Sequence, residues 1–238
     1  MKIATDEKLI KGKKRLAMIV WGLSLATLAV GLFYGFQSGT SQLGTLVMLG
    51  ALFIGATLYF INRNFMDTWM REPGFEVIVG RSLKGLGDRY SLYNYIAGDT
   101  HLLTGPNGLW LILPYDLKGT LYYDAAKDKW SYDSNKNFVS QIFSNEVFAN
   151  PKNEVAKTLK AWNNFVDKRA KVEGLPEPQP VIIFANNNLK LGTPDTPIPA
   201  VSAEKIKDLI RKQPQLTSEQ VEKVNQLQAA LEQYAAKK

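Results

Sequence analysis

The sequence contains no cysteine and a single histidine, His101. Without cysteine the chain cannot form a disulfide framework, a thiolate zinc site, an iron–sulfur cluster or a cysteine nucleophile. One histidine excludes a multi-histidine metal site. A Ser-His-Asp triad would have to use His101, and the sequence has no G-x-S-x-G motif to support such a triad.

Charged residues are absent from Leu16 to Asn62, a run of 47 residues. Two apolar stretches, 16–36 and 43–61, lie within this run and are separated by polar residues 37–42. A helix needs about 20 residues to cross a bilayer core, so the pattern predicts two transmembrane helices in a hairpin. A signal peptide has an apolar stretch of only about 7–15 residues. A hairpin buried in a soluble protein would show a polar face, and neither stretch has one.

The charges that flank these stretches predict their orientation. Residues 1–15 carry six basic and two acidic side chains, Arg63 and Arg71 follow the second stretch, and the turn carries no charge. The positive-inside rule then places both termini in the cytoplasm, on a multi-pass protein of the plasma or inner membrane. Neither stretch holds the ionisable groups that line transport pathways, so we expect an anchor in the lipid bilayer. The spacing Gly31-x-x-x-Gly35 predicts close helix packing, which we expect within the hairpin.

Residues 63–73 form a juxtamembrane linker, residues 74–212 a folded domain, and residues 213–238 a C-terminal helix. The spacing of apolar residues predicts a helix at 75–86, strands at 90–96, 100–104, 109–113, 119–124 and 129–132, a crossover helix at 151–169, a parallel strand at 181–184 and a helix at 203–212. We expect Ser202 to cap this last helix and Thr217-Ser-Glu-Gln220 to form a capping box for the C-terminal one. The order predicts one α/β domain with a mixed sheet.

Residues 74–212 resemble the NERD, or nuclease-related, domain. The resemblance is carried by Gly74-Phe-Glu76 with Val79 and Leu83, by the segment Asp99–Tyr115 with its core His101-Leu-Leu-Thr-Gly-Pro-Asn-Gly108, and by Gly119, Trp130, Asn150-Pro151 and the strand Val181–Phe184. It implies a restriction-endonuclease-like mixed-sheet α/β domain of the PD-(D/E)xK superfamily, whose nucleases hold Mg²⁺ with carboxylates and activate water with a lysine.

The residues at the implied nuclease site depart from the family pattern. Three of the four motif positions have changed: Thr100 stands at the aspartate, Leu113 at the glutamate and Tyr115 at the lysine. Only Glu76 keeps its identity. Asp99 and Asp116 each lie one residue away, where a strand turns its side chains to the opposite face. Glu76 and Asp99 are therefore the residual catalytic and metal-ligand candidates. His101 is expected to be a hydrogen-bonded structural residue.

Two functions follow from this comparison. The first is a membrane-anchored, cytoplasmic-facing domain that binds or scaffolds an unidentified protein partner, or serves as an accessory subunit of a membrane complex, with neither catalysis nor a cofactor. The alternative is a membrane-tethered, Mg²⁺-dependent nuclease or nucleic-acid-binding protein that uses Glu76 and Asp99. Residues 63–238 carry a net charge of only +3, which does not favour nucleic acid. Five basic residues are expected to form solvated helix faces: Lys205, Lys207, Arg211, Lys212 and Lys223.

Overall fold

The computed structural model describes residues 1–39, 41–134, 150–186, 188–193 and 195–237. The chain divides into two compact units. One is helical and comprises Glu7–Gly74, and the other combines Met1–Asp6 with Phe75–Lys238. The fold is the mixed α/β arrangement that the sequence predicts, with two long apolar helices followed by mixed β-sheets and further helices.

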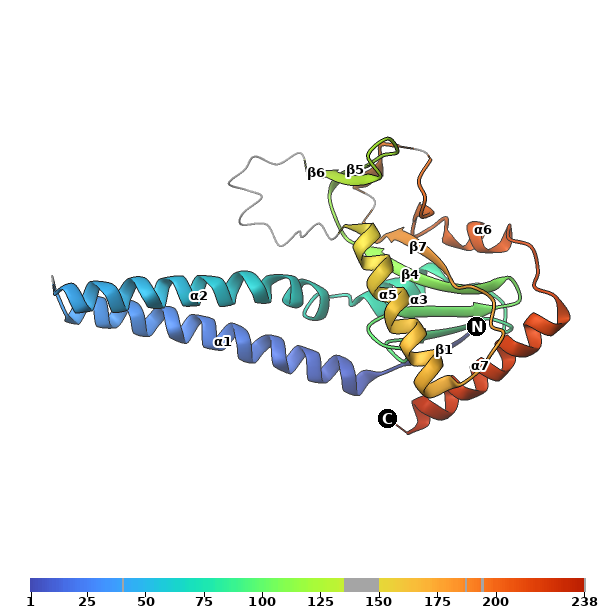
Figure 1. Ribbon diagram of the computed structural model, residues 1–238, viewed down its shortest axis with the longest axis horizontal. Coiled ribbons are helices and arrows are strands. Elements are labelled where there is room, and N and C mark those ends of the chain that lie inside the picture. The colour runs from blue at the N-terminus through green and yellow to red at the C-terminus, as the bar shows by residue number, and fades with distance from the viewer. Residues whose placement is uncertain (40, 135–149, 187, 194, 238) are drawn as a thin grey trace. The chain divides into compact units, whose positions relative to one another are not determined.

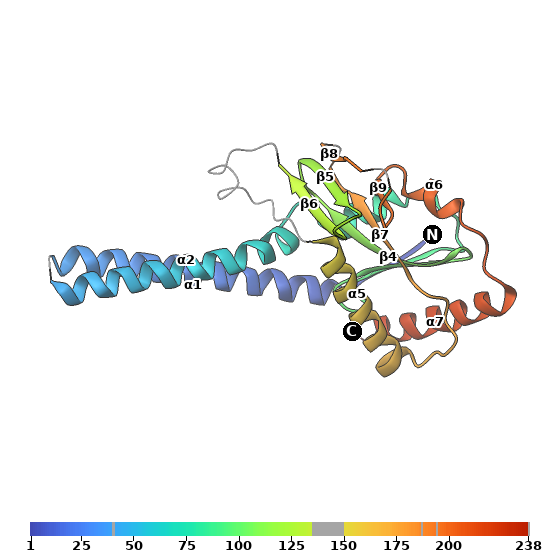
Figure 2. The same ribbon diagram turned by 45° about the horizontal axis from the view of Figure 1, so that its top comes forward.

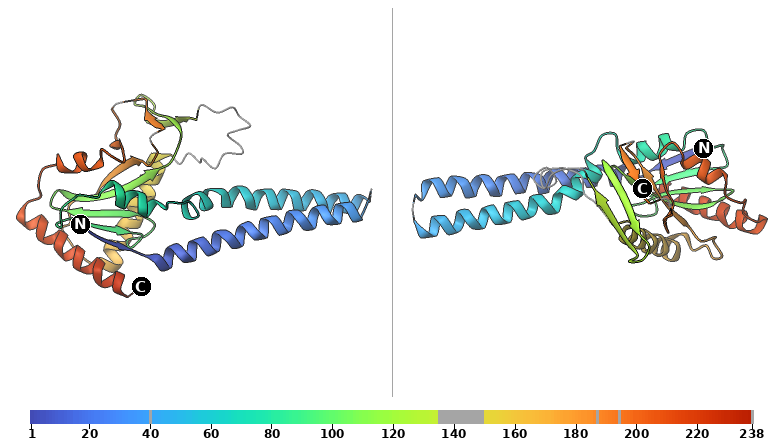
Figure 3. Two further views of the ribbon diagram at one scale, coloured as in Figure 1. Left: turned by 180° about the vertical axis from the view of Figure 1, so that it is seen from behind. Right: turned by 90° about the horizontal axis from the view of Figure 1, so that it is seen from above.

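The helical unit consists of α1, Glu7–Gln37, and α2, Gln42–Trp69, which run side by side in opposite directions (Figure 3). Both predicted apolar stretches lie within these helices, and the polar residues between them form the connection. At 1.5 Å per residue the helices are about 46 and 42 Å long, longer than the ~30 Å hydrocarbon core of a bilayer. They are long and apolar enough to cross a membrane. Large apolar side chains lie on their outer surface, such as Phe33 and Phe53, which are 69% and 75% exposed.

Glycines bring the two helices into close contact. A side chain added at Gly31 would meet the methyl group of Ala51, and one added at Gly35 would meet Met48. Gly22, on the same helix, has open space where its side chain would be. The Gly31-x-x-x-Gly35 spacing therefore packs α1 against α2 within one chain, as the sequence predicts.

Two hydrogen bonds from side chain to backbone join the helices. The Ser24 hydroxyl donates to the Gly55 carbonyl at 2.8 Å, and the Asn62 amide donates to the Ala17 carbonyl at 3.1 Å. Both side chains are buried between α1 and α2. Inside an apolar hairpin such bonds satisfy polar groups that have no access to water, and they fix the register of the two helices.

Residues Lys2–Thr5 form a strand, β1, that the sequence pattern did not predict. It pairs in parallel with β2, Ser91–Asn94, and the Asp6 N–H donates to the Asn94 carbonyl at 3.1 Å. The segment 1–15 is therefore not one basic tail, because its first six residues belong to the α/β unit. A four-residue strand is too short for a periodic signal, and its pairing comes from tertiary contacts. The chain thus passes from the α/β unit into the helical unit after Asp6, and it re-enters the α/β unit at Phe75.

The main sheet has six strands in the order β1-β2-β3-β4-β7-β9. The additional strands are β3 (His101–Gly105), β4 (Gly108–Tyr115), β7 (Gln179–Phe184) and β9 (Ala200–Ser202). β3 is antiparallel to both β2 and β4, whereas β7 is parallel to β4 and to β9. This confirms the predicted mixed sheet. Because helices cover both faces, β4 is apolar and buried along almost its whole length.

Helices cover the two faces of this sheet. α3, Phe75–Ser82, and α6, Ile206–Arg211, pack on one face, where Trp110 and Ile112 of β4 point. α5, Pro151–Phe165, and α7, Ser218–Ala236, pack on the other, against Leu109 and Leu111 (Figure 1). A single helical turn of π type, Val166–Ala170, extends α5. The alternation along β4 sends successive side chains into two separate apolar cores.

The two predicted helix caps have different outcomes. The capping box of α7 is confirmed, since Thr217 and Gln220 each accept the backbone N–H of the other. The cap at Ser202 is wrong, because Ser202 ends β9 and α6 begins only at Ile206, after a turn. Pairing with β7 holds Ser202 in the sheet, so it cannot serve the helix as a cap.

A small second sheet has the order β6-β5-β8, with β5 at Gly119–Asp124, β6 at Lys129–Asp133 and β8 at Leu189–Leu191 (Figure 2). The hairpin of β5 and β6 matches the predicted strands, whereas β8 was not predicted. Leu121 and Trp130 of this sheet pack with Leu113, Ile182 and Phe184 from the carboxyl ends of β4 and β7. A third apolar cluster thus closes the end of the main sheet.

Candidate functional site

The hairpin of β3 and β4 brings together two positions of the implied nuclease motif. His101 pairs with Ile112, so Thr100 directly precedes this pair and Leu113 directly follows it. Both lie at the carboxyl end of β4, and Tyr115 follows two residues later on the same face of the strand. Ligands of open α/β sheets commonly bind at this end of the strands. The hairpin therefore places Thr100, Leu113 and Tyr115, the changed positions of the implied motif, at one end of the sheet.

Apolar packing fills the positions of the motif glutamate and lysine. Leu113 and Tyr115 are each 7% exposed and belong to the third apolar cluster. Burial raises the pKa of the Tyr115 phenol above its usual range, and the nearby charge of Glu154 raises it further. The phenol is therefore neutral at physiological pH and cannot act as a base, while Leu113 offers no metal ligand.

Thr100 stands at the position that the resemblance assigns to a metal-binding aspartate. Its side chain is buried, and among the described residues its hydroxyl oxygen has no hydrogen-bond partner. A neutral hydroxyl group is a poor substitute for a carboxylate, because Mg²⁺ requires anionic oxygen ligands or water. The three changed positions thus share a loss of charge.

The residual candidates Glu76 and Asp99 come from separate elements, α3 and the turn before β3. Glu76 lies half-buried in the first turn of α3, which packs on the Trp110 face of the sheet. Asp99 is exposed in the turn before β3, and Asp116 follows the end of β4. Across the described ranges, no group of three or more acidic or histidine side chains is placed to hold a metal. Glu76 does lie at the positive end of a helix, where a carboxylate is favourable without any ligand.

A line of polar side chains crosses three strands, from Thr5 on β1 through Asn94 on β2 to His101 on β3. Nδ1 of His101 lies 2.8 Å from Oδ1 of Asn94, and Nδ2 of Asn94 donates to the Thr5 hydroxyl at 3.1 Å. The amide nitrogen of Asn94 donates to Thr5, so the Oδ1 atom of Asn94 is the atom that faces His101. Because this oxygen can only accept a hydrogen bond, His101 carries its proton on Nδ1. The Tyr95 ring packs on the imidazole at 4.7 Å. Burial lowers the pKa of His101 to about 3, so the ring is neutral.

The sequence pointed to His101 as a structural residue, but it did not reveal the partners Thr5 and Asn94. The available signal was Asn94 itself, a polar side chain in a strand whose neighbours are apolar or aromatic. Its burial requires hydrogen-bond partners, and the strand pairing supplies one from each side. The line therefore joins β1, and with it the start of the helical unit, to the centre of the sheet.

An open depression of about 560 Å³ lies beside the small sheet. Its lining consists of Tyr123, Asp195, Thr196, Pro197, Pro199, Ala200 and Val201. The Tyr123 hydroxyl donates to Asp128 at 3.0 Å and is therefore already engaged. With one carboxylate and mostly small or proline residues, the depression presents no set of groups for acid–base or nucleophilic chemistry.

No known family model matches the chain, and no similar curated protein or solved structure was found. The function must therefore follow from the chain's own residues and their geometry.

Proposed function

We propose that the protein is a membrane-anchored binding module whose NERD-like, restriction-endonuclease-type domain faces the cytoplasm and no longer cleaves nucleic acid. The observation that carries the proposal is the apolar burial of Leu113 and Tyr115. At these two positions a nuclease needs a metal-binding carboxylate and a lysine. A domain that keeps this hairpin but lacks the motif carboxylate and lysine serves as a scaffold for a protein partner, and it needs no cofactor.

The anchor rests on the apolar surface of the helical unit and on the residues at its base. Lys13 lies over the rings of Phe65 and Trp69 at 5.6 and 5.4 Å, next to the charge-free run. Aromatic and basic side chains of this kind are typical of the membrane interface. Since β1 belongs to the same unit as residues 75–238, both ends of the hairpin must lie on one side of the bilayer. The basic residues of 1–15 support the cytoplasm as that side.

Cysteine labelling in intact cells tests this topology, because the chain has no native cysteine. A membrane-impermeant maleimide is expected to label Gln37→Cys, at the exposed end of α1, from outside the cell. Ala126→Cys, in the exposed turn between β5 and β6, should react only after lysis. Labelling of Ala126→Cys before lysis would contradict the proposed orientation. If neither variant were labelled in the membrane fraction after lysis, the exposure of both sites would be contradicted.

A cleavage assay tests the loss of catalysis. The full-length protein, purified in mild detergent, is expected to leave single- and double-stranded DNA and RNA intact with millimolar Mg²⁺ or Mn²⁺. The matched control is the variant Glu76→Gln with Asp99→Asn, which removes both residual carboxylates and should be indistinguishable. Metal-dependent cleavage that this variant abolishes would show a working nuclease and overturn the proposal. Purification from the native membrane should instead yield a stoichiometric protein partner free of nucleic acid.

A further inference from the structure

Four basic side chains gather at the end of the main sheet where β1, β2 and β4 begin. Lys84 and Arg89 lie in the loop between α3 and β2, and Lys207 and Arg211 are one turn apart on α6. The Lys207 ammonium donates to the Lys84 carbonyl at 3.1 Å, and the Arg211 guanidinium donates to the Gly85 carbonyl at 3.0 Å. These two bonds join α6 to the loop, and Arg89 of the loop acts with Arg211 on the neighbouring Tyr90. The four residues are hereafter called the basic cluster.

The basic cluster is exposed and its charges are not neutralised. Lys84, Arg89 and Arg211 are exposed and Lys207 is half-buried. In the part of the chain that the structure describes, none of the four forms an ion pair with a carboxylate. Asp88, which precedes Arg89 in the sequence, pairs with the amino terminus at 3.0 Å.

Tyr90 lies within reach of cations from both the loop and α6. Burial raises the pKa of the Tyr90 phenol, and the charges of Arg89 and Arg211 oppose that rise. The phenol donates to Asn107 in the turn between β3 and β4, and the Asn107 amide donates to the Gln213 carbonyl at 2.6 Å just after α6. Hydrogen bonds therefore hold this end of the unit together beneath the cluster.

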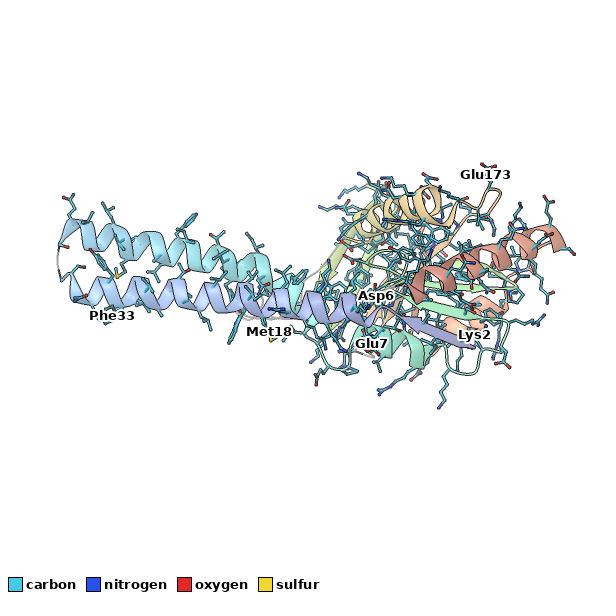
Figure 4. The ribbon with its side chains drawn as sticks, turned by 90° about the horizontal axis from the view of Figure 1, so that it is seen from below. Lys2, Asp6, Glu7, Met18, Phe33 and Glu173 are labelled. Atoms are coloured by element: carbon cyan, nitrogen blue, oxygen red, sulfur yellow. The ribbon has the colours of Figure 1, made fainter. Side chains whose placement is uncertain are left out.

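Within the α/β unit, the basic cluster lies at the end opposite to both connections with the helical unit. β1 begins beside Tyr90, since the Lys2 N–H donates to the Tyr90 carbonyl, and the chain departs at Asp6, beside Asn94. Figure 4 shows Lys2 and Asp6 at opposite ends of this strand. α3 likewise begins at Phe75, where the chain returns, and leads to the cluster. The cluster is thus also at the opposite end of the sheet from Thr100, Leu113 and Tyr115.

We propose that the basic cluster binds a short acidic segment of the protein partner. The proposal rests on the proposed function and names the chemistry of the partner. Guanidinium groups bind carboxylates in a bidentate manner, and four unpaired cations suit a segment with a few carboxylates. A nucleic-acid backbone needs a broader positive surface, whereas residues 75–238 carry 21 basic against 18 acidic side chains.

Fluorescence anisotropy of the full-length protein in mild detergent tests this. The probe is a labelled peptide with six alternating aspartate and glutamate residues, compared with its asparagine and glutamine counterpart. Binding of the acidic peptide should weaken about tenfold or more in Lys207→Glu with Arg211→Glu, and should fall with rising salt. The charge-matched control, Lys157→Glu with Lys160→Glu on exposed positions of α5, should bind as the native protein does.

A second variant tests the proposal independently, in case the first variant does not fold. Lys84→Glu with Arg89→Glu alters exposed side chains and should weaken binding of the acidic peptide to the same extent. Equal loss in the α5 control, no binding to the native protein, or tighter binding of a single-stranded oligonucleotide or of anionic vesicles would overturn the proposal. Its failure is distinguishable from failure of the proposed function. If the protein neither cleaves nucleic acid nor binds the peptide, only the role of the basic cluster is refuted. If it cleaves nucleic acid in the presence of metal, only the proposed function is refuted.

Discussion

Replacing Leu113 with glutamate is expected to lower the free energy of unfolding by more than about 3 kcal/mol, although it restores the residue type of the nuclease motif. The side chain is 7% exposed and packs with Tyr115, Ile182 and Phe184. There an ionised carboxylate would lose its hydration without gaining a cation, and a protonated one would still lose the apolar contacts of leucine. Urea denaturation of the full-length protein in mild detergent, followed by tryptophan fluorescence, measures the loss.

The matched control is Leu113→Met, which keeps volume and apolarity and should cost less than about 1.5 kcal/mol. If Leu113→Glu were as stable as this control, the site would have room and solvent for a charge. Stabilisation of the glutamate variant by millimolar Mg²⁺ would go further, because a ligand raises stability only if the folded state binds it. Either result would contradict an end of the sheet closed by apolar packing.

Elements with long or repetitive patterns could be predicted, and elements defined by their partners could not. The charge-free run predicts α1 and α2, and the continuous apolar run at 109–113 predicts a strand with two covered faces. β1 and β8 are strands of four and three residues, too short to show a period. Their pairing with β2 and β5 depends on residues about 90 and 70 positions away, a choice that local propensity does not encode.

The candidate site also has features that the sequence predicts and features that it does not. Thr100, Leu113 and Tyr115 could be assigned to motif positions because one hairpin fixes their register. What surrounds them could not be foreseen, since Trp130 and Phe184 arrive from β6 and β7. The sequence predicts Lys207 and Arg211 on a solvated helix face, and the exposure of Arg211 on α6 agrees with this prediction, but the sequence does not reveal which segment lies beside that face. The hydrogen bonds of these two residues to the loop at 84–85 join two segments more than 120 residues apart.

Acidification is expected to destabilise the α/β unit through His101. The pKa of this residue is about 3 in the folded protein and about 6.5 in an unfolded chain, because burial disfavours the charged ring. Below pH 6.5 the unfolded chain therefore gains a proton that the folded protein excludes. The contribution of His101 is complete above pH 6.5 and is lost as the pH falls toward 3. Each pH unit costs about 1.4 kcal/mol, so lowering the pH from 7 to 5 should cost about 2 kcal/mol.

His101→Asn isolates this contribution, because its amide can still donate to Asn94 and does not titrate. The variant should be less stable than the native protein at pH 7, since its smaller side chain leaves space beneath Tyr95. Between pH 7 and 5, however, its free energy of unfolding should change about 2 kcal/mol less than that of the native protein. Parallel curves would mean that the folded protein also protonates His101, and so that the line Thr5–Asn94–His101 opens to water. A steeper native curve would instead mean that burial keeps the imidazole neutral in the folded protein.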